Sequence, residues 1–185
     1  MRKLTMAVGI TLLSAVLGAC ANRDMPVSPL SPRGASFETS SAGDRPISIF
    51  DACDGPTFTA QGVDCSRTSG LRFDQFVSEL TAHGSVGAWH FAATNVNVFA
   101  GQTLTVTNHG GETHTFTEVA HFGGGIVPFL NQLSGNPVPA PECLELSGSD
   151  FIAAGDTRQE SVDESGTEMY QCCIHPWMRV VVSAK

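Results

Sequence analysis

The segment that most constrains the fold is MYQCCIHPWMRVVV, residues 169–182, close to the end of the 185-residue chain. Cys172, His175 and Met178 are spaced three and three, so a strand end followed by a tight loop can turn all three side chains toward one point. Thiolate, imidazole and thioether together suit copper, especially Cu(I), better than zinc, which rarely takes methionine. A fourth ligand must come from elsewhere in the fold. The candidate is His114, which begins an alternating strand pattern after a glycine turn.

The N-terminus indicates export. Residues 1–20 read MRKLTMAVGITLLSAVLGAC, in which two cations precede an apolar run that is too short to span a bilayer. The end of this run, LGAC, resembles the bacterial lipobox, which implies acylation of Cys20 and a membrane-anchored lipoprotein. A plain secretory signal with an unmodified cysteine is the alternative. Residues 21–47 are rich in Pro, Ser and Gly and predict a flexible tether.

Charge and compartment narrow the function classes. Removing Arg2 and Lys3 with the signal leaves 8 of 10 basic residues against 18 acidic ones, a net charge of −10. This balance argues against binding nucleic acid and against docking on anionic lipid by charge. Export places the chain in an oxidising compartment, so its cysteines are disulfide candidates as well as metal ligands. The sequence has no Ser-His-Asp spacing and no phosphate-binding glycine loop.

Residues 48–185 are enough for one domain. In LRFDQFVSELTAHG, apolar residues recur at helical spacing from Phe73 to Leu80, and Gly84 is placed to end the helix. Beyond it the period changes to two, and short alternating runs separated by Gly and Asn turns predict an all-β antiparallel sandwich. Residues 48–85 form an N-terminal extension with this one helix, and 123–150 form an irregular insertion.

A resemblance supports the copper interpretation. NVNVFAGQTLTVTNHGGETHTF, followed downstream by YQCCIHPWM, is similar to the cupredoxin family of type 1 blue copper proteins. CCIHPWMR is similar to the CxxHPxM loop of the amicyanin and plastocyanin branch, and the likeness covers roughly residues 86–185. It implies a Greek-key β-sandwich holding one type 1 copper ion. On matching positions it implies His114, Cys172 and His175 as the trigonal ligands and Met178 as the weak axial ligand.

The same resemblance distinguishes the two adjacent cysteines. Neighbours on a strand point to opposite faces, and the family spacing assigns Cys172 to the metal. Cys173 then faces away, and with Cys53, Cys65 and Cys143 it leaves four cysteines and three possible connectivities. The preferred pairing is Cys53 with Cys65 and Cys143 with Cys173. A vicinal link between the adjacent cysteines would be strained and would abolish the site.

The resemblance also sets expectations for the surroundings of the metal. It implies that His175, flanked by Pro176 and Trp177, is the ligand nearest solvent, in an apolar patch where partners dock. Thr115 stands where some relatives carry an asparagine that ties the ligand loops together, and its hydroxyl is expected to do this more weakly. Arg179 stands where relatives commonly have glycine, so the backbone there must accept a side chain.

The predicted function is one-electron transfer between exported redox proteins, by a lipid-tethered protein of the bacterial cell envelope. Two alternatives are a copper delivery protein, in which the metal is cargo, and an enzyme in which the insertion leaves an open coordination position. The sequence has no additional histidines in HxH spacing, which argues against a multicopper oxidase. We therefore expect an electron carrier rather than a catalyst.

Overall fold

The computed structural model describes residues 43–185, so the expected signal peptide, Cys20 and most of the expected tether lie outside it. The strands are β1 Arg45–Phe50, β2 His90–Phe91, β3 Asn95–Val98, β4 Gln102–Asn108, β5 His114–Thr115, β6 Thr117–Val119, β7 Phe151–Ile152, β8 Thr157–Val162, β9 Gly166–Gln171 and β10 Arg179–Ala184. The helices are α1 Gly55–Thr59, α2 Phe73–His83 and α3 Pro128–Leu133, with 3-10 turns at Pro141–Leu144 and Gly148–Asp150.

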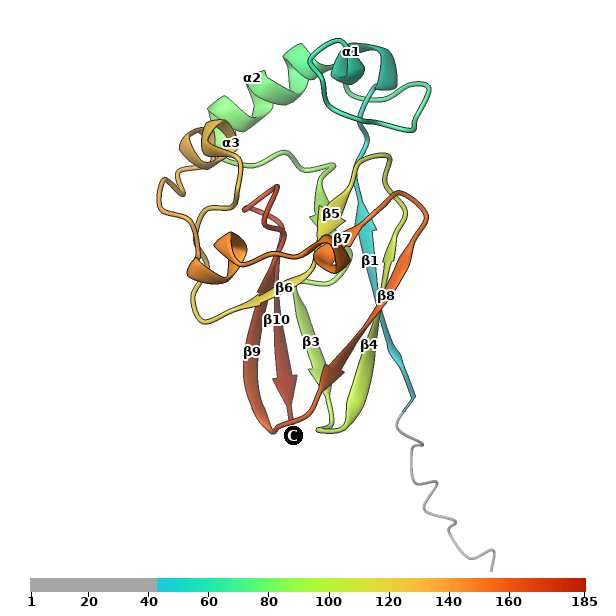
Figure 1. The fold of residues 1–185 in the computed structure, drawn as a ribbon, viewed down its shortest axis with the longest axis vertical. Coiled ribbons are helices and arrows are strands. Elements are labelled where there is room, and N and C mark those ends of the chain that lie inside the picture. The colour runs from blue at the N-terminus through green and yellow to red at the C-terminus, as the bar shows by residue number, and fades with distance from the viewer. Residues whose placement is uncertain (1–42) are drawn as a thin grey trace, which may run out of the picture. The chain divides into compact units, whose positions relative to one another are not determined.

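The strands form two four-stranded sheets, of order β2-β1-β4-β8 and β3-β10-β9-β6, together with a short β5-β7 pair (Figure 1). The predicted β-sandwich is confirmed. Its sheets are mixed, because β1 pairs with β4 in parallel and β3 pairs with β10 in parallel. A parallel pair cannot be closed by a hairpin. Here the chain between β1 and β4 passes through α1 and α2, and the chain between β3 and β10 passes through most of the domain.

The core lies between the two sheets, where alternate residues of each strand point inward. In β4 every second residue is buried, and in β10 the same alternation brings Val180 and Val182 inward. Phe116 stacks on Tyr170 at 4.4 Å between ring centroids. The apolar alternation in the sequence therefore identified the inward faces correctly.

Strand β1 begins at Arg45, inside the segment that the sequence analysis assigned to the tether. Ile47 and Ile49 alternate inward and are 1 % and 0 % exposed. Because these two side chains complete the core against β4, residues 45–47 belong to the sandwich, three residues ahead of the expected domain start at 48.

Three helices cover one end of the sandwich, the end away from the C-terminus (Figure 1). The expected helix is present as α2, and it ends at Gly84, whose φ of 69° is left-handed and suits glycine. The extension adds the short helix α1, whose first turn is capped by the Asp54 carboxylate accepting from the Thr57 N–H at 3.1 Å. The insertion contributes α3. No helix within residues 43–185 has the length and apolar character needed to cross a bilayer.

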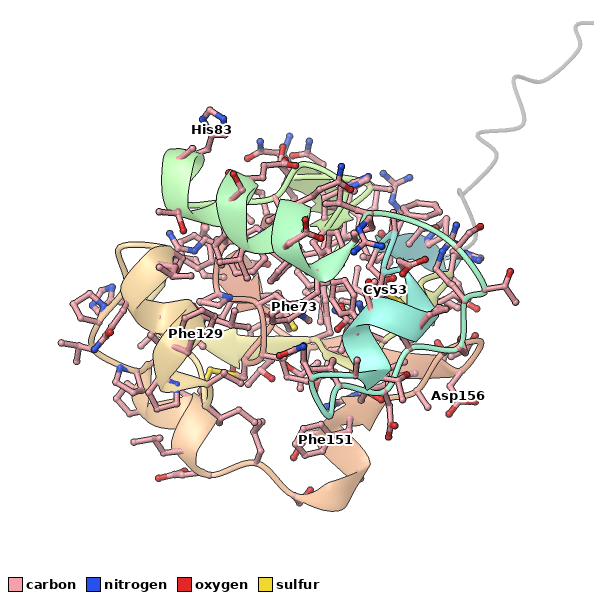
Figure 2. All side chains as sticks on the ribbon, turned by 90° about the horizontal axis from the view of Figure 1, so that it is seen from above. Cys53, Phe73, His83, Phe129, Phe151 and Asp156 are labelled. Carbon is pink, nitrogen blue, oxygen red and sulfur yellow. A yellow bond between two sulfur atoms is a disulfide. The ribbon has the colours of Figure 1, made fainter. Side chains whose placement is uncertain are left out.

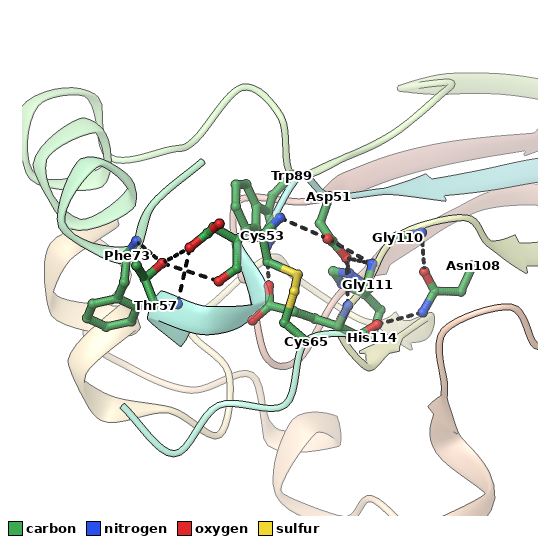
Figure 3. Close-up of a disulfide and its surroundings, with 12 residues drawn as sticks. Asp51, Cys53, Thr57, Cys65, Phe73, Trp89, Asn108, Gly110, Gly111 and His114 are labelled. Carbon is green, nitrogen blue, oxygen red and sulfur yellow. Dashed lines mark hydrogen bonds and ion pairs between the residues drawn. A yellow bond between two sulfur atoms is a disulfide. The ribbon is translucent and has the colours of Figure 1, made fainter. Parts of the chain in front are cut away.

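The N-terminal extension and the insertion are each held in place by a disulfide. Cys53–Cys65 closes a loop within the extension (Figure 3), and Cys143–Cys173 joins the insertion to the segment after β9. These are the two pairs that the sequence analysis preferred among the three possible connectivities. Within residues 43–185, Cys172 is the one cysteine left unpaired.

Candidate metal centre

Three side chains with metal affinity meet at the helix-covered end of the sandwich. His114 comes from β5, and Cys172 and His175 come from the loop between β9 and β10. Their ligand atoms all lie within 4.8 Å of one another. The Cys172 Sγ is 3.7 Å from the His114 Nδ1 and 3.8 Å from the His175 Nδ1. The upstream histidine therefore points at the C-terminal loop, as an upstream ligand would have to do.

These separations fit a metal ion at the centre of the group. With metal–nitrogen bonds of about 2.0–2.1 Å and a metal–sulfur bond of about 2.3 Å, a trigonal angle requires about 3.8 Å between sulfur and nitrogen, and a tetrahedral angle requires about 3.5 Å. The two distances in this protein are closer to the trigonal value. Trigonal His₂Cys coordination with a weak axial ligand is the geometry of blue copper sites.

The loop that carries two of these groups is closed by its own backbone. The Cys172 N–H donates to the Met178 carbonyl at 3.0 Å, and the Met178 N–H donates to the His175 carbonyl at 2.9 Å. Met178 is 1 % exposed, so its side chain lies in the interior. The 3-3 spacing thus produces a compact turn that holds all three predicted loop ligands in one buried segment.

Two backbone amides point at the Cys172 sulfur. The N–H groups of Thr115 and His175 each approach Sγ at 3.5 Å. Burial alone would raise the pKa of this thiol, but the hydrogen bonds and charges of His114 and His175 hold it well below its usual value. The site therefore favours a thiolate, which is the form that binds metal.

Thr115 ties the two ligand loops together. Its hydroxyl accepts a hydrogen bond from the Cys173 N–H at 2.8 Å, and both residues are fully buried. This is the interaction that the sequence analysis expected from a threonine at the position next to His114. It couples β5 to the loop that carries the thiolate.

A buried carboxylate stands behind His114. The Asp51 Oδ2 lies 2.9 Å from the His114 Nε2 (Figure 3). Outer carboxylates do this for many metal-binding histidines: Asp51 holds the Nε2 proton, so when Nδ1 loses its own proton to a metal ion, the Nδ1 lone pair faces the metal position. The pKa of Asp51 is about 2, because hydrogen bonds from His114 and from the backbone outweigh the effect of burial. Burial would lower the pKa of His114, but Asp51 and Cys172 raise it to about 9.

The turn after β4 is shaped around this carboxylate. Asp51 accepts from the Gly111 N–H at 2.9 Å and from the Glu112 N–H at 3.0 Å. A Cβ at Gly110 would collide with the Asp51 carboxylate, and one at Gly111 would collide with Cys53 and Arg67. The two glycines of the NHGGE turn are therefore required by the close approach of β1 and its following loop.

A second buried carboxylate stands near His175. The Glu112 Oε2 is 3.6 Å from the His175 Nε2 and also accepts a hydrogen bond from the Trp89 indole N–H. Glu112 is 4 % exposed and Trp89 is 1 % exposed. Burial raises the pKa of Glu112, and His175 and Trp89 oppose that rise. Each of the two predicted ligand histidines thus has an acidic side chain beside its Nε2.

Of the four predicted ligands, His175 is the most exposed, as expected, and its surroundings are apolar, but it does not lie on an open surface. His175 is only 3 % exposed. The extension and the insertion cover it, because side chains from α1, α2 and α3 close over the loop, and Trp177 packs against the ring at 5.4 Å between centroids. Trp177 is half-buried at the edge of the core, where it also contacts Phe76.

Arg179 occupies the first position of β10, where the extended backbone accepts a side chain. Its guanidinium donates to the Asn136 Oδ1 at 2.6 Å and to the Pro176 carbonyl at 2.8 Å, and it lies over the Phe122 ring. The departure from glycine therefore has a structural use. Arg179 connects the insertion to the loop that carries Cys172 and His175.

Asp51 and Glu112 were not identified from the sequence. Glu112 lies two residues before His114, within the quoted GGETHTF segment, so its proximity to the site was open to inference. Asp51 follows the alternating segment of β1, and its place beside His114 depends on the parallel pairing of β1 with β4. That long-range pairing leaves no local signal.

No family model matches the chain, and no curated protein matches it. Among solved structures, a novel purple cupredoxin from Nitrosopumilus maritimus aligns with TM-score 0.44 at 18% identity, covering 77% of this chain and 100% of that one. The amicyanin from Paracoccus versutus aligns with TM-score 0.35 at 18% identity, covering 55% of this chain and 77% of that one. A mutant amicyanin in its Cu(I) form aligns with TM-score 0.37 at 18% identity, over 59% and 89% of the two chains.

Proposed function

We propose that this protein binds one copper ion through His114, Cys172 and His175, with Met178 as a weak axial ligand, and carries single electrons. The observation that carries the proposal is the pair of sulfur–nitrogen distances, 3.7 and 3.8 Å, which match trigonal coordination. Copper bound here would supply a Cu(II)/Cu(I) couple. The chain's own contribution is to fix the donors so that they move little between the two states.

Several contacts hold the proposed ligands in fixed positions. Asp51 orients His114, Thr115 joins the two loops, and the Cys143–Cys173 disulfide anchors the residue next to the thiolate. The two N–H groups on the Cys172 sulfur withdraw electron density from it, which favours the reduced metal. The carboxylates near the histidines favour the oxidised metal, so these two sets of groups act on the reduction potential in opposite directions.

Absorption spectroscopy tests the metal site. Copper-loaded protein is expected to show an intense visible band from thiolate-to-copper charge transfer, and Cys172→Ser is expected to abolish it. The matched control is the double variant Cys53→Ser with Cys65→Ser, which removes a disulfide away from the sulfur ligand and should keep the band. A folded, copper-loaded wild-type protein without the band would remove the proposal.

Retention of the metal separates a carrier from a delivery protein. The buried donors favour slow release, because the ion has to pass the side chains that cover His175. A carrier should keep its copper through repeated oxidation and reduction in the presence of a competing chelator. Loss of copper to the chelator within a few redox cycles would favour delivery of copper as cargo.

Location and partners belong to the same proposal. The export signal and the lipobox-like LGAC support acylation at Cys20 and attachment to a membrane of the bacterial cell envelope, with exported redox proteins as electron partners. Mass spectrometry of the N-terminal peptide from expressing cells tests this directly. An acylated Cys20 is expected, and an unmodified cysteine or cleavage elsewhere would contradict the anchor.

A further inference from the structure

A cavity of about 290 Å³ lies beside His175, between the helices that cover the site. Its walls are formed by α1 and the loop after it, by α2, by α3 and by the metal loop. Most of the lining is apolar and aromatic, and Glu112 and His175 are its titratable groups. The lining residues used in the argument are Phe58, Val63, Phe73, Phe129, Glu112 and His175.

The N-terminal extension and the insertion form most of the walls of this cavity. Phe73 is on α2 in the extension and Phe129 is on α3 in the insertion, and both are at the helix-covered end (Figure 2). His83 points outward from the far end of α2, away from this region. The helices that shield His175 from a protein partner thus leave a space beside the His175 ring that can hold a small molecule.

Glu112 offers an acceptor at the wall of the cavity. Its Oε2 is taken by the Trp89 indole and lies near His175, whereas its Oε1 accepts no hydrogen bond within residues 43–185. The residue is 4 % exposed, but this oxygen is not among the fully buried unpaired atoms of residues 43–185, so it is an acceptor that remains accessible from an otherwise apolar cavity. Such a group can accept one hydrogen bond from a ligand that displaces water from the cavity.

The size and walls of the cavity select a single aromatic ring. A cavity of about 150 Å³ can hold benzene, so this space accommodates one ring with a small substituent. Aromatic walls favour offset or edge contacts with such a ring. A neutral donor is favoured over a cation, because the metal-bound imidazole of His175 would already place positive charge near Glu112.

We propose that this cavity binds a small phenol or hydroquinone, with its O–H donating to the Glu112 Oε1 and its ring next to His175. This inference rests on the proposed copper site for its redox consequence, but not for binding. From this position a hydroquinone could pass one electron through the His175 ring to copper held at the proposed site, which would supply the Cu(II)/Cu(I) couple that accepts it. In that step the O–H bond would break, the proton would pass to solvent water, and the ligand would leave as a neutral radical.

Binding is tested first on copper-free protein, by calorimetry and by NMR titration, with phenol and its methyl ether, anisole. The two rings are alike, but anisole has no hydrogen to donate. Phenol is expected to saturate at one molecule per chain and to bind at least tenfold more tightly than anisole. Equal affinities, or no saturable binding of phenol, would overturn the proposal, and this comparison needs no variant.

Filling the cavity is the second test. Val63→Trp places a large side chain into the lining and is expected to weaken phenol binding at least tenfold. The matched control is Val138→Trp, at an exposed position of the insertion outside the cavity, which should bind phenol as the wild type does. Circular dichroism establishes that both variants fold. Unchanged binding in folded Val63→Trp would place phenol elsewhere and overturn the proposal.

The third test uses the copper-loaded protein. Its reduction by hydroquinone should show saturation with concentration and slow at least tenfold in Val63→Trp. Hexacyanoferrate(II), which is too large and too highly charged for the cavity, should reduce both proteins at the same rate. A rate that rises linearly with hydroquinone and is equal in both proteins would overturn the redox step. If copper-loaded wild-type protein showed no visible band, the copper proposal would fail, but the proposal that copper-free protein binds phenol would not be affected.

Discussion

Replacing Thr115 by valine tests how the two ligand loops are coupled. The change keeps the side-chain shape and removes the hydroxyl that accepts from the Cys173 N–H at 2.8 Å. Both residues are fully buried, so the amide is left without water as a substitute partner. An unsatisfied buried donor costs about 1–3 kcal/mol, which is the loss we expect in the free energy of unfolding. The Thr117 hydroxyl also loses its acceptor, but it is partly exposed and can turn to water.

The assay is thermal and urea unfolding of copper-free protein. For a domain of this size the expected loss lowers the melting temperature by about 3–12 °C. Thr115→Ser keeps the hydroxyl, so its free energy of unfolding should fall much less than that of Thr115→Val. Thr107→Val removes an exposed hydroxyl that contacts Thr157 and should change the free energy by less than about 0.5 kcal/mol. Thr115→Val at wild-type stability, with an unchanged visible spectrum after copper loading, would refute the coupling.

Three further predictions concern the disulfide, the Asp51 carboxylate and a surface acid. Replacing Cys143 and Cys173 together by alanine removes the disulfide between residues 30 positions apart. The free energy of unfolding in urea should fall by about 3–4 kcal/mol, and a fall of less than about 1 kcal/mol would contradict the prediction. Asp51→Asn removes a negative charge behind His114 and should raise the reduction potential by about 59 mV or more, a tenfold change in the redox equilibrium; voltammetry showing a fall would contradict it. Burial and neighbouring acids, chiefly Glu168 and Glu160, raise the pKa of Glu118, so its ionised form destabilises the fold at neutral pH. Glu118→Gln should therefore melt higher than wild type at pH 7, and the difference should vanish below the unfolded-state pKa of about 4.3; an equal gain at both pH values would contradict it.

The strand alternation and the metal loop could be predicted from the sequence because both depend on local spacing. The observed burial follows the period of two, as at Val180 and Val182, and the 3-3 spacing of Cys172, His175 and Met178 fits the turn that the backbone forms. The helix 73–83 followed from an apolar stripe that ends at a glycine, and its observed bounds agree.

The environment of the site could not be predicted in the same way, because it is made by contacts between distant segments. Asp51 reaches His114 across 63 positions, through a parallel pairing that no hairpin signal announces. The burial of His175 arises where the extension meets the insertion, and neither segment alone contains that information. The family resemblance correctly placed His175 nearest solvent among the predicted ligands, but it could not show how deeply the ring is buried, because it covers neither of the two segments that pack around it.

The pairing of Cys143 with Cys173 has a consequence for how the protein matures. Oxidants acting on the new chain could join two adjacent thiols and destroy the sulfur donor before any metal arrives. With Cys173 committed to a partner 30 positions away, Cys172 has no neighbouring thiol with which to react. If the chain folds under oxidising conditions, as proposed, this disulfide would keep Cys173 from reacting with Cys172 and so leave one sulfur available for the proposed metal ion.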